Sequence, residues 1–267
     1  MSFTIRELES LADYDACIAL QDETWGRGFS ERVPVAILRV AQKIGGVSAG
    51  AFDDEGQMAG FVFGMTGLRD GALVHWSDML AVRPDARGTG LAERLKQYQR
   101  ERVLSLGARL MYWTADPLVA RNAHFNINHL GAMPSEYIVN MYGDNTGSIL
   151  HGAMPTDRFV YRWQLDQPTP AVRSGQADAG DAALPAAIAV GPDGAPAFIS
   201  PGAGEDFCVR LPHDLTAMQA SDPALALAWR VAVRDALASG LSRGYAVARF
   251  VRGTGDTLPY YVLTAAR

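Results

Sequence analysis

The chain has 267 residues, of which 48% are hydrophobic and 20% charged, so a sizeable core can form and wholesale disorder is excluded. Its formal net charge is -5, which argues against nucleic acid or an anionic membrane as the main partner. Arginine supplies almost all of the positive charge, since only Lys43 and Lys96 are lysines.

The N-terminus has neither the basic nor the apolar segment of a signal peptide, and no apolar stretch reaches the ~18 residues of a membrane span. We therefore expect a cytoplasmic protein without a membrane partner. Two cysteines, Cys17 and Cys208, are too few for a disulfide framework or a metal cage, and both are expected to be small buried residues.

Residues 3–165 carry hydrophobic patterns in the order β-α-α-β-β-β-α-β-α-β-β, which predicts a mixed α/β (α+β) domain over residues 1–165. Ser10 is expected to cap the first helix, whose inward face carries Leu11, Tyr14 and Ile18. The predicted strands lie around residues 3 and 5 and over residues 47–52, 58–65, 73–82, 109–114, 137–141 and 158–165. The further helices are predicted over residues 34–44, 90–106 and 119–128.

Residues 166–204 are rich in Pro, Gly and Ala and are predicted to be a connector with one weak hairpin. Residues 205–267 regain periodicity as a βαββ unit, with Asp222 as the helix cap and Pro223 at the first helical position. At ~60 residues this unit would be marginal alone, so we expect it to pack on the first domain. It could supply a wall of the acceptor pocket or a homodimer surface.

The most informative segment joins the strand that ends at Val82 to the helix that begins at Gly90. The first N–H groups of a helix have no intrahelical acceptor and carry partial positive charge, and glycines such as Gly88 let a phosphate approach them closely. The dinucleotide fingerprint is excluded because Glu93 stands where its third glycine is needed. A Walker loop is excluded because no Gly-Lys-Ser/Thr follows.

This segment resembles the GNAT (GCN5-related N-acetyltransferase) family, whose signature is Gln/Arg-x-x-Gly-x-Gly/Ala after a strand that ends in Val. Arg87-x-x-Gly90-x-Ala92 matches that signature. The long C-terminal extension resembles a less-characterised branch of the family. The resemblance implies acetyl-CoA or another acyl-CoA as co-substrate, with the pantetheine arm paired to the main chain of Leu80 and Val82. It also implies that the coenzyme pyrophosphate is held by the main chain of Arg87, Gly88, Thr89, Gly90, Leu91 and Ala92; the alternative is an ordinary glycine turn.

The helix predicted after residue 114 departs from the family pattern. Asn122 can keep the coenzyme-binding role that the resemblance implies. However, aligning Gly131 with the family glycine puts Ile127 where a tyrosine would protonate the departing thiolate, and Ala132 replaces a phenylalanine. A thiolate is a tolerable leaving group, so transfer remains feasible, or another residue serves as the acid.

Asp78 is the candidate general base or amine anchor, because a regular strand places it on the same side as Leu80 and Val82. A structural, hydrogen-bonded carboxyl at a point where strands splay is the alternative. His75 is expected to face the other way and is the weaker candidate.

Other side chains are candidates for the acceptor site. Glu23 and Glu136 lie in segments that often line this pocket in the family. The polar, glycine-rich residues 142–148 suit either a substrate-covering loop or a plain surface loop. Aromatic residues could form an acceptor site, although aromatics on strands are more often core residues. These aromatics are Trp25, Trp76, Trp113, Tyr137 and Tyr142.

Two patterns that indicate other classes are set aside. Residues 46–50 fit the hydrolase nucleophile elbow around Ser48, but they lie at a passage from helix to strand, whereas the elbow needs strand-turn-helix. His124 and His129 are five residues apart, so we expect them not to share a helix face as zinc ligands four apart would. We predict no metal site, and His129 is only a remote candidate acid.

The sequence thus predicts a coenzyme-A-dependent N-acyltransferase with a GNAT-like fold, transferring the acyl group to a small-molecule amine or amino acid by direct attack. The alternative is a non-catalytic acyl-CoA-binding or regulatory module that has lost the tyrosine. The acyl group, the acceptor and the oligomeric state are left open.

Overall fold

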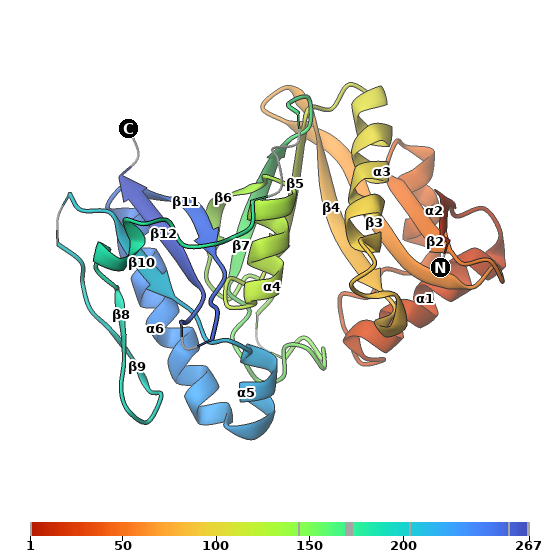
Figure 1. Cartoon of the computed structure of the whole chain (residues 1–267). Helices are drawn as coiled ribbons and strands as arrows, with labels where there is room; N and C mark the ends of the chain where they lie inside the picture. Colours follow the sequence, from red (N-terminus) through yellow and green to blue (C-terminus); the bar gives the residue numbers. More distant parts are fainter. Residues whose placement is uncertain (1, 144, 169–172, 203, 256, 266–267) are drawn as a thin grey trace. The chain divides into compact units, whose positions relative to one another are not determined.

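The computed structural model describes residues 2–143, 145–168, 173–202, 204–255 and 257–265. The chain forms two compact units (Figure 1). Unit 1 comprises Met1–Trp113, Asn145–Ala153 and Arg162–Pro168. Unit 2 comprises Thr114–Asp144, Met154–Tyr161 and Thr169–Arg267.

The sheet of unit 1 is built on four antiparallel strands in sequence order, followed by a parallel one. The antiparallel strands are β1 (Thr4–Glu7), β2 (Val47–Phe52), β3 (Met58–Arg69) and β4 (Ala72–Val82). The parallel neighbour of β4 is β5 (Leu110–Ala115), and the last residues of β7 (Arg158–Gln164) also belong to unit 1. The predicted element order is therefore confirmed up to β5, and β3 is four residues longer than predicted.

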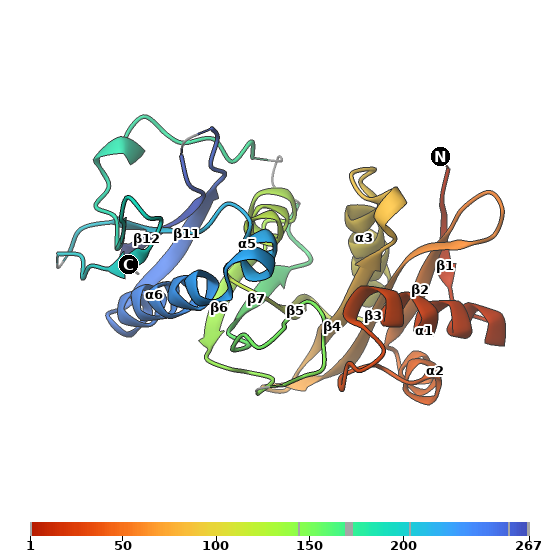
Figure 2. The ribbon, with the colours of Figure 1, turned by 90° about the horizontal axis from the view of Figure 1, so that it is seen from below.

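Helices cover both faces of this sheet (Figure 2). On one face, α1 (Leu11–Trp25) and α2 (Val35–Lys43) bury a core that includes Phe61, Phe63 and Met79. On the other face lies α3 (Leu91–Ser105), over strand positions that are glycines. A Cβ on Gly60 would come within 3.1 Å of the Leu95 side chain, so the absence of side chains lets α3 lie close to the sheet.

Helix α1 begins as predicted, with a capping box in which Ser10 and Asp13 bond each other's main-chain N–H groups. Its predicted inward face was wrong at Leu11, which is 65% exposed, whereas Tyr14 and Cys17 are buried. The reason is an ion pair: Arg6 on β1 holds Asp13 with two hydrogen bonds of 2.7 and 2.9 Å, and this turns the first helical turn toward Asp13.

Unit 2 contains a three-stranded sheet with the order β10-β12-β11. These strands are β10 (Phe207–Arg210), β11 (Tyr245–Val251) and β12 (Tyr260–Ala265). Before α6 (Pro223–Ser242) stands the shorter α5 (Leu215–Ser221). Asp222 caps α6 as predicted, by accepting from the Leu225 N–H. Trp229, Val233 and Leu237 are buried along the helix.

The rest of unit 2 includes a helix of mixed type. Four α-helical residues, α4 (Ala120–Ala123), run directly into a π-helix, η2 (His124–His129). Strand β6 (Met133–Ile138) starts four residues earlier than predicted and stops before Asn140, which has a positive φ of 50°. The hairpin predicted in the connector is present as β8 (Ile188–Val190) and β9 (Pro196–Phe198).

Unit 2 contains buried ion pairs that join α6 to the segments after β5 and before β7. Arg230 on α6 is 1% exposed and donates from both terminal nitrogens to the Asp116 carboxylate, which also lies 3.7 Å from Arg158. One turn later, Arg234 donates two hydrogen bonds of 2.8 Å to Asp157, which is fully buried. Such paired charges are costly to break, because removing one partner leaves the other uncompensated.

The compact units divide the chain within β5 and β7, and not at residues 165 and 204 as the three predicted segments do. Part of the predicted connector, residues 169–172 and 203, lies outside the described residues. The segments 1–165, 166–204 and 205–267 stay a prediction about functional domains. Both cysteines are free and buried, as expected. Within the described ranges, no helix combines the length and apolar character that a membrane span needs.

Candidate functional site

The turn between β4 and α3 has two glycines in left-handed conformations. Gly88 and Gly90 both have φ near 78°, a conformation that other residues adopt only with strain. Gly90 is the N-cap of α3 and supplies no side-chain hydrogen bond to the helix. A Cβ on either glycine would meet nothing within 4 Å, so a ligand has room to approach the main chain here.

Five consecutive N–H groups of this turn donate no hydrogen bond within the part of the chain that the structure describes. The first intrahelical bond of α3 runs from the Arg94 N–H to the Gly90 carbonyl. These free donors lie at and just before the start of α3, at the positive end of the helix dipole, which favours an anion. They belong to Gly88, Thr89, Gly90, Leu91 and Ala92.

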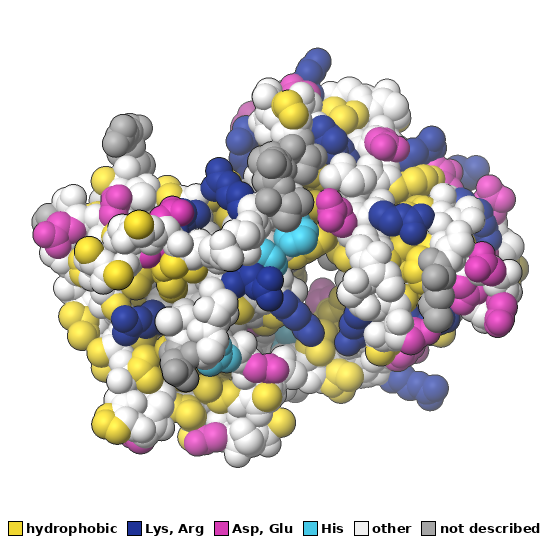
Figure 3. Space-filling view, in the orientation of Figure 1, with side chains coloured by type: hydrophobic (Ala, Val, Ile, Leu, Met, Phe, Trp, Pro, Cys, Tyr) yellow, Lys and Arg dark blue, Asp and Glu magenta, His cyan; other side chains and the backbone are white. Residues whose placement is uncertain are grey.

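The two arginines that flank the turn differ in availability. Arg83 is engaged by Asp85 at 2.7 Å and by Asp53 at 3.3 Å. Arg87 is exposed, its Nε donates to the Val82 carbonyl at 3.2 Å, and among the described residues no carboxylate pairs with it. Basic and acidic side chains are interspersed over the surface in view (Figure 3). Positive potential for a phosphate must therefore come from groups beside the turn, such as Arg87 and the helix N–H groups.

The edge of β4 that faces β5 is paired over a short distance only. The parallel pairing covers Val74–Trp76 against Leu110–Tyr112, and no pairing with β5 is present from Ser77 to Val82 in the described structure. The Arg83 N–H donates to the Ala59 carbonyl on β3, which fixes the alternation of the antiparallel ladder. The N–H and C=O groups of Leu80 and Val82 therefore point away from β3, toward the unpaired edge.

Asp78 is the extra residue of a β-bulge. Phe63 faces Met79 across the β3–β4 ladder, while the next β3 residue, Gly64, faces Ser77, so Asp78 has no partner. The bulge reverses the alternation of β4, and the expectation that Asp78 shares a side with Leu80 and Val82 is wrong. Its side chain lies on the side of Trp76, whose indole N–H donates to the Asp78 carboxylate at 3.3 Å.

The carboxyl of Asp78 is exposed to solvent, yet neighbouring protein atoms desolvate it and raise its pKa above the ordinary value. The negative charge of Glu31 adds to this rise in pKa, and the Trp76 hydrogen bond opposes it. A carboxylate with a raised pKa is a stronger base than a free aspartate, which suits proton removal from an amine.

A polar layer lies buried between α3 and the sheet, and sequence reasoning did not find it. Gln99 donates to Nε2 of His75 at 3.0 Å, and the other ring nitrogen of His75 lies 2.9 Å from the Thr66 hydroxyl. Desolvation lowers the pKa of His75 to about 3, so the ring is neutral. Lys96 on α3 donates to the Ser77 hydroxyl at 2.7 Å. The sequence did hold a signal for this layer. Lys96 and Gln99 lie at helical spacing from each other and from the apolar Val103, which indicates that all three are on the buried face of α3.

The acceptor candidates of unit 1 lie on the α1 side. Trp25 is half-buried and contacts Phe29 and Phe61, with ring centres 5.9 and 6.3 Å apart. Glu23 is exposed. Residues 145–153 pack on the loop after α1, because the Ser30 N–H donates to the Thr146 carbonyl and the Ile149 N–H to the Trp25 carbonyl. Of the predicted covering loop, residue 144 lies outside the described residues.

Trp113 is a core residue, 6% exposed and in edge contact with Trp163. The other aromatic candidates, Tyr137 and Tyr142, belong to unit 2. Tyr137 donates to Asp157 at 2.9 Å, and the Tyr142 hydroxyl lies 2.8 Å from the Thr114 hydroxyl. The five aromatics are thus divided between the two units.

Unit 2 also holds Asn122 and Glu136, both exposed, and the two histidines of the π-helix. The expectation that His124 and His129 do not share a helix face is wrong, since their Nε2 atoms are 3.2 Å apart. A π-helix brings residues i and i+5 into line, which an α-helix does not. No group of three metal-ligating side chains occurs among the described residues.

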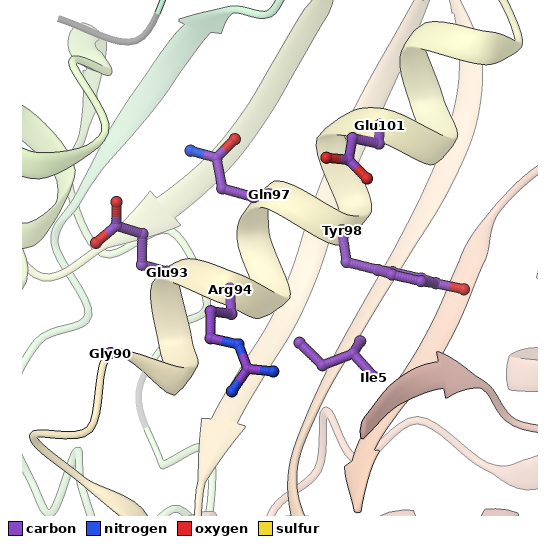
Figure 4. Close-up of a pocket in the computed structure, with 7 residues that line it drawn as sticks. All are labelled: Ile5, Gly90, Glu93, Arg94, Gln97, Tyr98 and Glu101. Carbon is purple, nitrogen blue, oxygen red and sulfur yellow. The ribbon is translucent and has the colours of Figure 1, made fainter. Parts of the chain in front are cut away.

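A depression of about 490 Å³ begins at Gly90 and follows the outer side of α3 (Figure 4). Its rim carries Glu93 and Glu101, and the single cation among its lining residues, Arg94, donates to the Phe3 carbonyl at 2.7 Å. Two carboxylates and an engaged arginine do not suit a polyphosphate, so the turn itself is the better matched site for an anion.

This chain has a GNAT-type α/β fold with additional C-terminal strands. Three features define it: the order of elements from β1 to β7, the parallel pairing of β4 with β5 across the intervening α3, and the glycine turn before α3. The order matches the one that the sequence predicted. The resemblance drawn from the Arg87–Ala92 signature is therefore confirmed for the fold.

Solved acetyltransferases are similar in structure to this chain. An N-acetyltransferase from Staphylococcus aureus Mu50 has a TM-score of 0.49 at 17% identity and covers 62% of this chain and 100% of its own. An aminoglycoside 6'-N-acetyltransferase complexed with coenzyme A has a TM-score of 0.47 at 14% identity and covers 62% of this chain and 98% of its own. The ribosomal-protein-S18-alanine N-acetyltransferase from Escherichia coli has a TM-score of 0.47 at 16% identity and covers 64% of this chain and 99% of its own. No protein-family model matches the sequence, and no curated protein matches it.

Proposed function

We propose that this chain is an acyl-CoA-dependent N-acyltransferase that moves an acyl group, acetyl in the first instance, to a small-molecule amine or amino acid. The observation that carries the proposal is the run of free N–H groups from Gly88 to Ala92, at the start of a helix that follows an unpaired strand edge. A diphosphate is the kind of group that such a turn holds best.

The coenzyme would use both parts of this arrangement. Its pyrophosphate would accept from the turn amides, with the unpaired guanidinium of Arg87 beside them. Its pantetheine amides would pair with the outward N–H and C=O groups of Leu80 and Val82, as an added strand pairs with a sheet edge. Asn122, exposed on α4, is the proposed further contact.

Acyl transfer then needs a neutral amine and a base for its proton. Asp78 would accept that proton as the amine nitrogen attacks the thioester carbonyl. The C–N bond forms, the C–S bond breaks, and the sulfur leaves with its electron pair. No covalent acyl-enzyme is required, because amine and thioester are bound together.

Binding is tested by isothermal titration with acetyl-CoA. Gly90→Asp places a negative charge at the proposed diphosphate site and should weaken binding at least tenfold, about 1.4 kcal/mol. Gly56→Asp is the matched control, since Gly56 has a φ of 76° and equally open surroundings in the β2–β3 turn. Absence of binding by the unmodified protein at millimolar acetyl-CoA would overturn the proposal.

Turnover is tested by the release of free thiol from acetyl-CoA with a library of amines. Asp78→Asn should lower kcat by roughly 10²-fold or more and leave the Kd of acetyl-CoA unchanged. Asp54→Asn, in the exposed turn, is the control and should change neither kcat nor Kd. Binding without any thiol release would instead support the non-catalytic acyl-CoA-binding module, which the loss of the family tyrosine at Ile127 already suggests.

A further inference from the structure

Lys96 lies where β4 and β5 stop pairing. The last paired residues are Trp76 and Tyr112, and the next residue on each strand touches Lys96. Its Nζ donates to the Ser77 hydroxyl at 2.7 Å and lies 3.9 Å from the ring centre of Trp113. The ammonium is thus held at the start of the unpaired strand edge by a hydroxyl and an aromatic face.

The surroundings of Lys96 contain no counter-charge. The residue is 2% exposed, and no carboxylate lies within ion-pair distance of Nζ in the described part of the chain. The titratable group nearest to it on β4 is His75, which is neutral and whose own pKa the charge of Lys96 helps to lower. Strand β5 presents Trp113, and α3 presents the neutral Gln99. Desolvation lowers the pKa of Lys96 to about 7, so the group can both hold and release a proton near neutrality.

The position of Lys96 corresponds to the reacting end of the proposed coenzyme. An arm that starts at the turn and pairs with Val82 and then Leu80 reaches Asp78 and Ser77 next, roughly 10 Å further along the strand. At this level the bulge puts Asp78 on the α1 side of β4, while Ser77 faces α3 and Lys96. A base and a cation therefore lie on opposite sides of the strand beside the same point.

We propose that Lys96 is the proton donor to the departing thiolate, an inference that rests on the proposed acyl transfer. As the C–S bond breaks, the electron pair stays on sulfur and takes a proton from Nζ, which gives the free thiol and a neutral lysine. Water returns the proton to Lys96 after product release. Asp78 takes the separate proton of the attacking amine and loses it to water, so the cycle balances.

This role supplies what the helix after β5 lacks. Ile127, at the position of the family tyrosine, is 3% exposed and has no proton to give. Lys96 is a proton donor of suitable chemistry on a different element, and among the described residues it is buried without a carboxylate partner.

The test compares two acyl donors that differ in the leaving atom only. Acetyl-CoA releases a thiolate, whereas the selenium analogue of acetyl-CoA releases a less basic selenolate that does not need protonation. Lys96→Met should lower kcat with acetyl-CoA by about 100-fold or more and change kcat with the selenoester by less than fivefold. Lys43→Met, at the exposed lysine of α2, is the control and should change neither rate. Thermal unfolding and the Kd of acetyl-CoA verify that each variant is folded and binds.

The unmodified protein gives a second readout if Lys96→Met does not fold. Its kcat with acetyl-CoA should fall as the pH rises through about 7, and that fall should be absent with the selenoester. Equal losses with both donors, a pH profile shared by both, or an acyl adduct on Lys96 in the intact mass would overturn the role of Lys96 and leave acyl transfer standing. Absence of turnover by the unmodified protein would overturn acyl transfer itself.

Discussion

Lys96 in unit 1 and Arg230 in unit 2 are both helical cations that are almost completely buried, yet their surroundings differ. Arg230 faces the carboxylate of Asp116, whereas Lys96 has a hydroxyl and an indole ring. A paired buried charge is a structural element, and an unpaired one lowers stability. The contrast agrees with the proposal that Arg230 is a structural cation and Lys96 a functional one.

The largest expected effect is on the pH dependence of stability. Because the pKa of Lys96 is lowered from 10.5 to about 7, the unfolded chain binds one more proton between these values, and stability rises with pH across this window. Lys96→Met removes the buried charge and should therefore raise the free energy of unfolding, by the largest amount below pH 7. This gain should shrink by on the order of 4–5 kcal/mol toward pH 10.5.

Urea unfolding of both proteins at a series of pH values checks this prediction. Arg230→Met serves as the comparison, since arginine keeps its proton throughout and its difference from the unmodified protein should show no slope of this kind. A difference between Lys96→Met and the unmodified protein that is constant with pH would mean that Lys96 is not desolvated as described.

The second effect concerns the paired cation. Asp116→Ala removes the carboxylate that is hydrogen-bonded to the buried Arg230 and should lower the free energy of unfolding by about 3 kcal/mol. Asp166→Ala removes the exposed partner of Arg109 and should change stability little. Equal effects of the two substitutions in chemical denaturation would remove the distinction between buried and exposed pairs.

The smallest effect tests the polar layer that surrounds Lys96. A Cβ on Gly64 would lie 2.3 Å from His75 Nε2 and 2.7 Å from the Gln99 amide, so Gly64→Ala should cost about 2 kcal/mol of stability through overpacking. Gly67→Ala on the same strand meets nothing within 4 Å and is the control. Thermal unfolding that ranks both alike would show that α3 can move away from the sheet.

Local patterns in the sequence predicted the caps and the turn correctly. Ser10 and Asp222 begin helices because a side-chain oxygen can reach an N–H two or three residues ahead, which needs no distant partner. Gly88 and Gly90 likewise adopt positive φ within a short segment. The element order up to β5 followed from hydrophobic periodicity.

Three features did not follow from local patterns in the sequence. The bulge at Asp78 exists only in the register of β4 against β3, so a regular alternation misplaced its side chain. The contact between His124 and His129 depends on a π-helical segment that spacing alone does not reveal.

Lys96 is the clearest case. The sequence by itself determined that the chain has two lysines, that residue 96 follows the glycine turn by two helical turns, and that the turn can hold an anion. Only the tertiary structure decided that the side chain of this lysine lies between α3 and the sheet, against Ser77 and Trp113, with no carboxylate of the described residues within ion-pair distance. The reason is that burial of a charge is set by what packs over it, and those neighbours come from strands far away in the sequence.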